Sequence, residues 1–285
     1  MTTRNGLLKP RTMLLTAFLV STSCITLSYG EPRSYGAALH DADWTVKASI
    51  FECSLSQSIP QYGSVGFYQQ AGESLEFRLQ PFEDLMSKKG LELSAAPPPW
   101  NPQLAQRDLG SLPDIADSES LQLDATMARR LMGEMLNGMM PTFKGSSIYD
   151  EQQVMTVVLS PLHFRSAYNQ YQQCSGQLLP VNFDQVQYST VFWPSGANSL
   201  SSAAMAMLDN IVLYAQADSS IRGFEEDSFT DTAGERRENL LVSEERAFLV
   251  TNYLVRRGID SETIATRAHG EREEYLIVNP EKSQA

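Results

Sequence analysis

The chain has 285 residues and a formal net charge of −12 at pH 7, with 42% hydrophobic and 20% charged residues. This composition is typical of packed globular domains, and the length favours two of them. So acidic a chain argues against a protein that follows nucleic-acid phosphates, because that mode of binding needs a basic surface. The three histidines lie far apart in the sequence, so we expect no metal site and no cofactor.

The first 30 residues predict a secretory signal. They begin with three basic residues, Arg4, Lys9 and Arg11, and no charged residue follows between positions 12 and 30. The apolar stretch after Arg11 is short and rich in Ser and Thr, which is typical of an export signal and not of a membrane span. Small residues at the end of the stretch favour cleavage after Gly30.

Two alternatives stay open for this segment. One is a lipoprotein signal that uses Cys24 and gives the chain an association with the outer membrane. Against this alternative, Ser21 stands where such signals normally carry Leu. The other is an apolar helix that stays in the fold.

Cleavage after Gly30 would leave two cysteines, Cys53 and Cys174. An even number of cysteines in an exported chain favours a disulfide, because the compartment is oxidising. The alternative is a pair of buried free thiols.

Residues 31–182 are predicted to form a β-rich domain with a few helices. Alternating and apolar patterns predict, in chain order, strands over 44–50, 65–67 and 75–79, a helix over 123–136, a strand over 154–159 and a helix over 163–174. We expect a turn at Gly72 and a helix cap at Asp124. Three consecutive prolines at 97–99 exclude a helix there. No nucleophile, paired acid or metal-binding motif occurs in this half, which gives no indication of an enzyme.

Residues 183–285 predict strands that alternate with helices. Strands are expected over 189–193, 221–225 and 264–268, with one helix face running from Leu200 to Ala215. A charged, glycine-containing loop is expected to reach Asn239. A second helix is predicted to begin at Ser243 as its N-cap and to stop before Gly258. The order βαβαβ predicts a two-layer sandwich with helical crossovers between parallel neighbours, so the fold class is α+β.

Residues of the predicted loop and second helix carry a spaced motif. After Thr230, the motif consists of Asp231, Gly234, Asn239, Ser243, Arg246, Ala247 and Val250. At these spacings the sequence resembles the OmpA-like peptidoglycan-binding domain, with Val242 in place of a Leu. Seven matched positions within twenty make the resemblance specific.

The resemblance implies binding of the diaminopimelate residue in peptidoglycan stem peptides, which ends in an ammonium and a carboxylate. We expect Asp231 to accept hydrogen bonds from the ammonium and Arg246 to hold the carboxylate with two parallel hydrogen bonds. If the helix begins at Ser243, Arg246 lies in its first turn, where free N–H groups also favour an anion. Asn239, Thr230 and Ser243 are expected to shape the loop and the cap. The alternative is a simple salt bridge between Asp231 and Arg246.

Two features depart from the pattern of that family. Ser228 and Phe229 stand where the family usually has Gly-His, and the N-R-R-V segment expected after Gly270 is missing. The C-terminal domain, 183–285, therefore resembles a shortened member, with a short strand predicted over 275–278. Both departures predict that the domain binds peptidoglycan weakly or not at all.

A longer resemblance covers roughly residues 40–272. It is carried by Trp44, Phe51–Cys53, Ile59–Gly63, Tyr171, Cys174, the segment 178–185 and Phe192–Gly196. The chain resembles the MotY family of sodium-driven flagellar motors, in which the two cysteines are joined. The resemblance implies a non-enzymatic periplasmic protein. Its first half would attach to the basal body and a MotX-like protein, and its second half would hold the peptidoglycan and help to retain the stator complex.

Two other functional classes are considered. One is a general cell-envelope protein that binds peptidoglycan through diaminopimelate and has no role in motility. The other is a periplasmic enzyme acting on peptidoglycan, which would need a positioned acid, nucleophile or metal. The acidic residues at 225–227 and Glu271 have no recognisable catalytic partner in the sequence.

Overall fold

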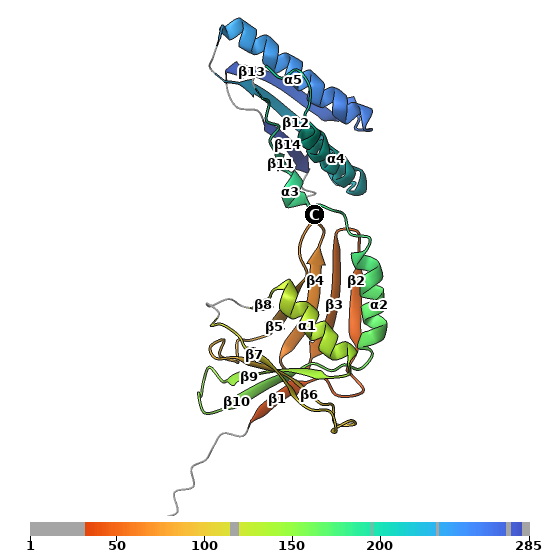
Figure 1. Cartoon of the computed structure of the whole chain (residues 1–285), viewed down its shortest axis with the longest axis vertical. Helices are drawn as coiled ribbons and strands as arrows, with labels where there is room; N and C mark the ends of the chain where they lie inside the picture. Colours follow the sequence, from red (N-terminus) through yellow and green to blue (C-terminus); the bar gives the residue numbers. More distant parts are fainter. Residues whose placement is uncertain (1–31, 115–119, 195, 232–233, 272–274, 281–285) are drawn as a thin grey trace, which may run out of the picture.

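The computed structural model describes residues 32–114, 120–194, 196–231, 234–271 and 275–280. Figure 1 shows a β-rich lower body and an upper body of helices and strands, joined by a narrow connection. The fold class is α+β, as predicted. The predicted signal over residues 1–30, with Cys24, lies outside the described residues. Within the described ranges, no helix combines the length and the apolar character needed to cross a membrane.

The lower body contains two five-stranded sheets. One is antiparallel, in the order β2 (Trp44–Ala48), β3 (Glu52–Ile59), β4 (Gly63–Gln70), β5 (Glu76–Pro81) and β8 (Leu121–Leu123). The other has the order β1 (Arg33–Gly36), β10 (Val154–Val158), β9 (Met140–Ser146), β6 (Glu92–Ala96) and β7 (Arg107–Ser111). In the second sheet, only the β1–β10 pair is parallel.

Aromatic side chains join the sheets and helices of the lower body. Phe77 on β5 stacks on Phe143 of β9, with ring centroids 5.5 Å apart, so that the two sheets share one core. Helix α2 (Phe164–Ser175) adds Phe164, whose ring meets Trp44 edge-on at 5.0 Å. Helix α1 (Ala125–Leu136) begins at its predicted cap, because the Asp124 side chain accepts a hydrogen bond from the Met127 N–H at 2.9 Å. Both predicted helices are confirmed.

In the part of the upper body that the structure describes there are eight elements. They are α3 (Phe183–Val186), β11 (Tyr188–Ser189), α4 (Ser202–Ala217), β12 (Ile221–Thr230), α5 (Arg236–Arg256), η1 (Ser261–Thr263), β13 (Ile264–Glu271) and β14 (Tyr275–Pro280). The sheet has the order β11-β14-β12-β13. Strand β12 runs parallel to β13, and β14 runs antiparallel to both β11 and β12. Helices α4 and α5 share one apolar core with the inner side of β12.

Two strands of the upper body, β11 and β12, differ from the prediction. Strand β11 is shorter than the predicted 189–193 and does not pair with β12, because β14 lies between them and satisfies the backbone groups of both. The short strand predicted over 275–278 is thus confirmed, and it completes the sheet. Strand β12 is longer than predicted, because it continues through Thr230 where a loop was expected.

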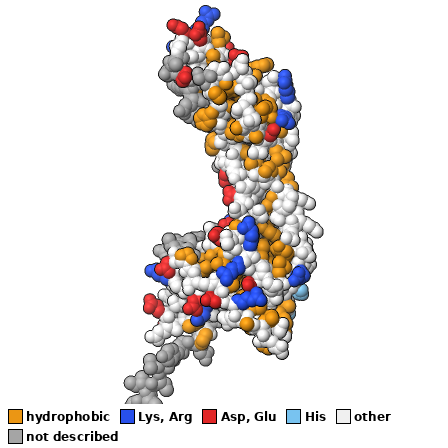
Figure 2. Space-filling model, viewed as in Figure 1, with side chains coloured by type: hydrophobic (Ala, Val, Ile, Leu, Met, Phe, Trp, Pro, Cys, Tyr) orange, Lys and Arg blue, Asp and Glu red, His pale blue; other side chains and the backbone are white. Residues whose placement is uncertain are grey.

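Helix α5 also starts earlier than predicted, at Arg236 and not after Ser243. The early start is not apparent from the sequence because the buried residues of the first two turns, Asn239 and Ser243, are polar, and because apolar residues occupy both sides of this helix. Ala247, Val250 and Leu254 are buried, whereas Leu241, Phe248 and Val255 are exposed. Hydrophobic side chains are accordingly visible on the surface of the upper body in Figure 2. Only positions 231–235 therefore separate β12 from α5.

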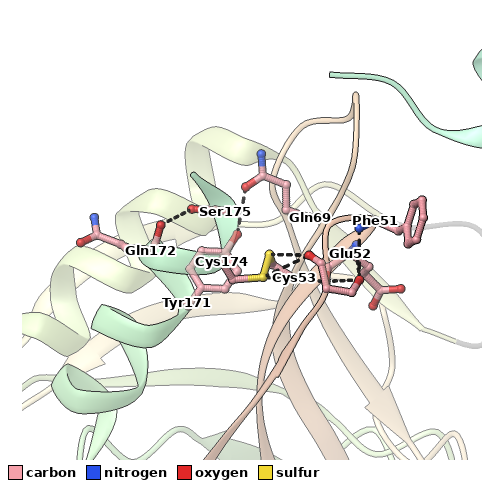
Figure 3. Close-up of a disulfide and its surroundings, with 9 residues drawn as sticks. Phe51, Glu52, Cys53, Gln69, Tyr171, Gln172, Cys174 and Ser175 are labelled. Atoms are coloured by element: carbon pink, nitrogen blue, oxygen red, sulfur yellow. Dashed lines mark hydrogen bonds between the residues drawn. A yellow bond between two sulfur atoms is a disulfide. The ribbon is translucent and has the colours of Figure 1, made fainter. Parts of the chain in front are cut away.

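A disulfide lies where the chain leaves the lower body. It joins Cys53 on β3 to Cys174 at the end of α2, with 5.9 Å between their Cα atoms (Figure 3). The predicted disulfide is therefore present, and the alternative of free thiols is wrong. The bridge closes a loop of 121 positions, and the disputed loop-entropy model assigns about 5 kcal/mol of stabilisation to such a crosslink.

The two bodies contact each other beside this disulfide. Phe51 of the lower body meets Tyr214 of α4, with ring centroids 5.5 Å apart, and packs against the upper core. The Asn182 side chain donates to the Glu73 carboxylate at 3.0 Å. Gly72 has a φ of +70°, and a Cβ there would lie 2.8 Å from the Cα of Val181. This close approach explains the glycine at the predicted turn and fits the connection tightly against the lower body.

Candidate functional site

The motif residues lie at one edge of the upper sheet. Strands β11, β12 and β13 all point toward that edge, and β12 and β13 end there as neighbours. Strand β11 ends earlier, level with Glu226, and the segment 190–194 follows it, whereas the connection 231–235 leaves β12 at the edge itself. Crevices outside the carboxyl ends of strands are common ligand sites in sheets of this kind.

Asp231 and Asn239 form the junction between β12 and α5. Thr230 is the last residue of β12 and is buried, whereas Asp231 is exposed. The buried Asn239 lies in the first turn of α5, and its Nδ2 donates to the backbone oxygen of Asp231 at 3.3 Å. Gly234 adopts a φ of +103°, which favours glycine. Asn239 therefore holds the Asp231 backbone at the start of the loop.

Ser243 is not a helix cap. It is fully buried, seven residues inside α5. Its hydroxyl donates to the Leu240 carbonyl at 2.8 Å and accepts from the Gly270 N–H of β13 at 3.1 Å. Gly270 has a φ of +72°, a backbone conformation that favours glycine. Ser243 thus fixes the position of α5 along β13.

Arg246 lies deeper in α5 than expected. It is ten residues beyond Arg236, which is about 15 Å along the helix axis. The positive end of the helix has little effect at that distance, because its influence fades within the first turn. The expectation that the helix end helps Arg246 to bind an anion is therefore wrong. Arg246 is half-buried, and its guanidinium carbon lies 5.3 Å from the centroid of the Trp193 ring.

Two aromatic features of this edge are not apparent from the sequence. Trp193 lies in the segment after β11, whereas the sequence predicts it only as the last residue of a strand over 189–193. His269 is the extra residue of a bulge in β13, and its ring stacks on Phe229 with 4.6 Å between centroids. Its Nε2 lies 2.7 Å from an oxygen of Asp227. The imidazole of His269, on the neighbouring strand, thus lies against Phe229, which occupies the position where the OmpA-like pattern has His.

The arrangement suits binding of a small charged group. An exposed carboxylate at Asp231 and a guanidinium at Arg246 provide opposite charges on the loop and helix that meet at this edge. Such a pair of groups matches a ligand with both an ammonium and a carboxylate. In the parts of the chain that the structure describes, no group of three or more His, Cys, Asp or Glu side chains is placed to hold a metal ion.

We predict that Ser243→Ala lowers the free energy of unfolding by about 1–3 kcal/mol, because it leaves the buried Gly270 N–H without its acceptor. Chemical denaturation monitored by circular dichroism would measure the change. Ser202→Ala, at an exposed position in α4, is the matched control and is expected to stay within about 0.5 kcal/mol of the unmodified protein. Equal stability of the two variants would contradict the role of the Ser243 contact.

Both halves of the chain match known protein families. Residues 35–180 match the family described as MotY N-terminal domain, and residues 192–284 match the OmpA family. The sodium-type flagellar protein MotY of Vibrio parahaemolyticus serotype O3:K6 (strain RIMD 2210633) is 24% identical over 243 residues, which cover 84% of this chain and 83% of that protein. Among solved structures, the OmpA-like domain of FopA1 from Francisella tularensis is 21% identical, with a TM-score of 0.29, over 33% of this chain and 72% of that structure.

Proposed function

The chain belongs to the MotY family, and we propose that it is a non-enzymatic periplasmic component of a sodium-driven flagellar motor that anchors the motor to peptidoglycan. The support comes from the matches in both halves of the chain. The match to the MotY N-terminal domain comes first and the match to the OmpA family follows.

We place peptidoglycan binding at the junction of β12 and α5. The observation that carries this assignment is the hydrogen bond from Asn239 to the backbone of Asp231, which holds the backbone that bears this exposed carboxylate beside the helix that carries Arg246. In this proposal the Asp231 carboxylate accepts hydrogen bonds from the ammonium of diaminopimelate. Arg246 binds the carboxylate of the same residue with its planar fork of donors. Thr230, Asn239 and Ser243 support these two groups.

We assign attachment to the motor to the first half of the chain. Residues 31–182 would bind the basal body and a MotX-like protein, and residues 183–285 would hold the wall and so help to keep the stator complex in place. The close fit of Phe51 against Tyr214 supports this division, because a load taken up by one body reaches the other through packed side chains. The pKa of Tyr214 is raised, mainly by burial of the phenol and also by the nearby Asp218 carboxylate. This phenol therefore stays neutral.

We predict that the purified protein co-sediments with peptidoglycan sacculi and that the double variant Asp231→Ala, Arg246→Ala does not. Removing both groups takes away the charge-assisted hydrogen bonds to the ammonium and to the carboxylate of the ligand, each worth about 1.5–3 kcal/mol. The sedimented fraction is measured by gel densitometry at several protein concentrations.

The control for this experiment is a variant with the same change in charge elsewhere on the upper body. Arg222→Ala combined with Glu262→Ala removes one basic and one acidic side chain at exposed positions outside the site. This control should sediment as the unmodified protein does. Absence of sedimentation by the unmodified protein would contradict the anchoring role.

The alternative function is a general envelope protein that binds peptidoglycan and has no part in motility. A strain that lacks the gene separates the two functions. We predict that it assembles filaments, visible by electron microscopy, but swims poorly or not at all, because the stator is not retained. Normal swimming in that strain would contradict the motor assignment and favour the alternative.

A further inference from the structure

Trp193 lies under the guanidinium of Arg246, 5.3 Å from ring centroid to guanidinium carbon. The indole is half-buried and packs against the apolar core of the upper body. Its neighbours show that the segment is anchored at this point, since Val191 is buried whereas Phe192 is 82% exposed. The Trp193 ring is therefore held by its packing, and the Arg246 guanidinium contacts its face.

An aromatic face is well suited to orient an arginine. A cation over an indole ring is attracted by the negative face of the ring, an interaction worth more as the site is desolvated. Because this attraction is not a conventional hydrogen bond, it occupies no N–H donor of the guanidinium. The planar fork needs a defined orientation to bind a carboxylate through two parallel bonds, and a free arginine side chain loses much rotational entropy when it adopts one.

We propose that Trp193 is a positioning residue for Arg246 and holds its guanidinium ready for a ligand carboxylate. The proposal rests on the function proposed above and adds a specificity to it. A site whose cation is held in place for two parallel bonds prefers a free carboxylate over an amide, which cannot accept both bonds with charge assistance. The preferred ligand is therefore a stem peptide whose diaminopimelate is not amidated.

The contact itself is tested without any ligand. The chain has three tryptophans, so the indole N–H region of an NMR spectrum should contain three signals, and the Trp193→Phe variant identifies one of them. Arg246→Gln should shift that signal and leave the signals of Trp44 and Trp100 in place. Arg256→Gln, at an exposed position of the same helix, is the control and should shift none of them. A Trp193 signal that does not respond to Arg246→Gln would overturn the proposal.

The role in binding is tested by a double-mutant cycle with a synthetic stem peptide that ends in non-amidated diaminopimelate. Loss of a cation–aromatic contact of about 0.5–2 kcal/mol corresponds to a roughly two- to thirtyfold increase in Kd, which we expect for Trp193→Leu. In the Arg246→Gln background, Trp193→Leu should have no further effect, because the two residues act as one unit. Trp193→Phe, with a smaller aromatic face, should lie between the unmodified protein and Trp193→Leu.

Several outcomes separate this proposal from the function on which it rests. If the unmodified protein binds the peptide but Trp193→Leu binds equally well, or if the two losses simply add, the positioning role is wrong and the function stands. If the unmodified protein does not bind the peptide, both are wrong. Trp100→Leu, at an exposed position in the lower body, is the matched control for removal of an indole. The amidated peptide should bind the unmodified protein more weakly and respond little to Trp193→Leu.

Discussion

The candidate site depends on one buried contact, in which the Ser243 hydroxyl accepts the Gly270 N–H and donates to the Leu240 carbonyl. This contact sets the position of α5 along β13. One turn before Ser243, the helix brings Asn239 to the backbone of Asp231, and one turn after it brings Arg246 to Trp193. A side chain at position 270 would need a strained left-handed backbone, so the glycine and the serine together define how the helix lies on the sheet.

The connection between the two bodies is a second constraint. The disulfide holds the end of α2 against β3, so the chain leaves the lower body from a fixed point. A few residues later Asn182, which is buried, bonds to Glu73, and Tyr214 of α4 covers Phe51. Aromatic packing and a partly buried hydrogen bond resist bending better than a flexible linker would. A ligand bound at the far edge of the upper sheet is thus linked to the lower body through ordered contacts. Such a link suits the anchoring role proposed above.

Much of the fold could be predicted from local patterns, whereas the position of α5 could not. The Asp124 cap and the alternating strands of the lower body are local signals, and the structure confirms them. The inner side of β12 carries buried Glu226, Ser228 and Thr230, so its polar sequence resembles a loop although it is a strand. Ser is a common helix cap, and only tertiary contact with β13 shows that Ser243 lies inside a helix. The spacing of Asp231, Asn239 and Arg246 predicts one site, but Trp193 is far away in sequence and has no place in that spacing.

In the proposed function, one edge of the upper sheet receives the ammonium and the carboxylate of diaminopimelate. A crystal structure of the protein with a diaminopimelate-containing stem peptide tests it most directly. We predict that the ligand ammonium lies within hydrogen-bond distance of the Asp231 carboxylate and that the ligand carboxylate binds the Arg246 guanidinium. The Trp193 ring is expected to contact the other side of that guanidinium. A peptide bound elsewhere on the protein, or bound at this edge without contact to Asp231 and Arg246, would contradict it.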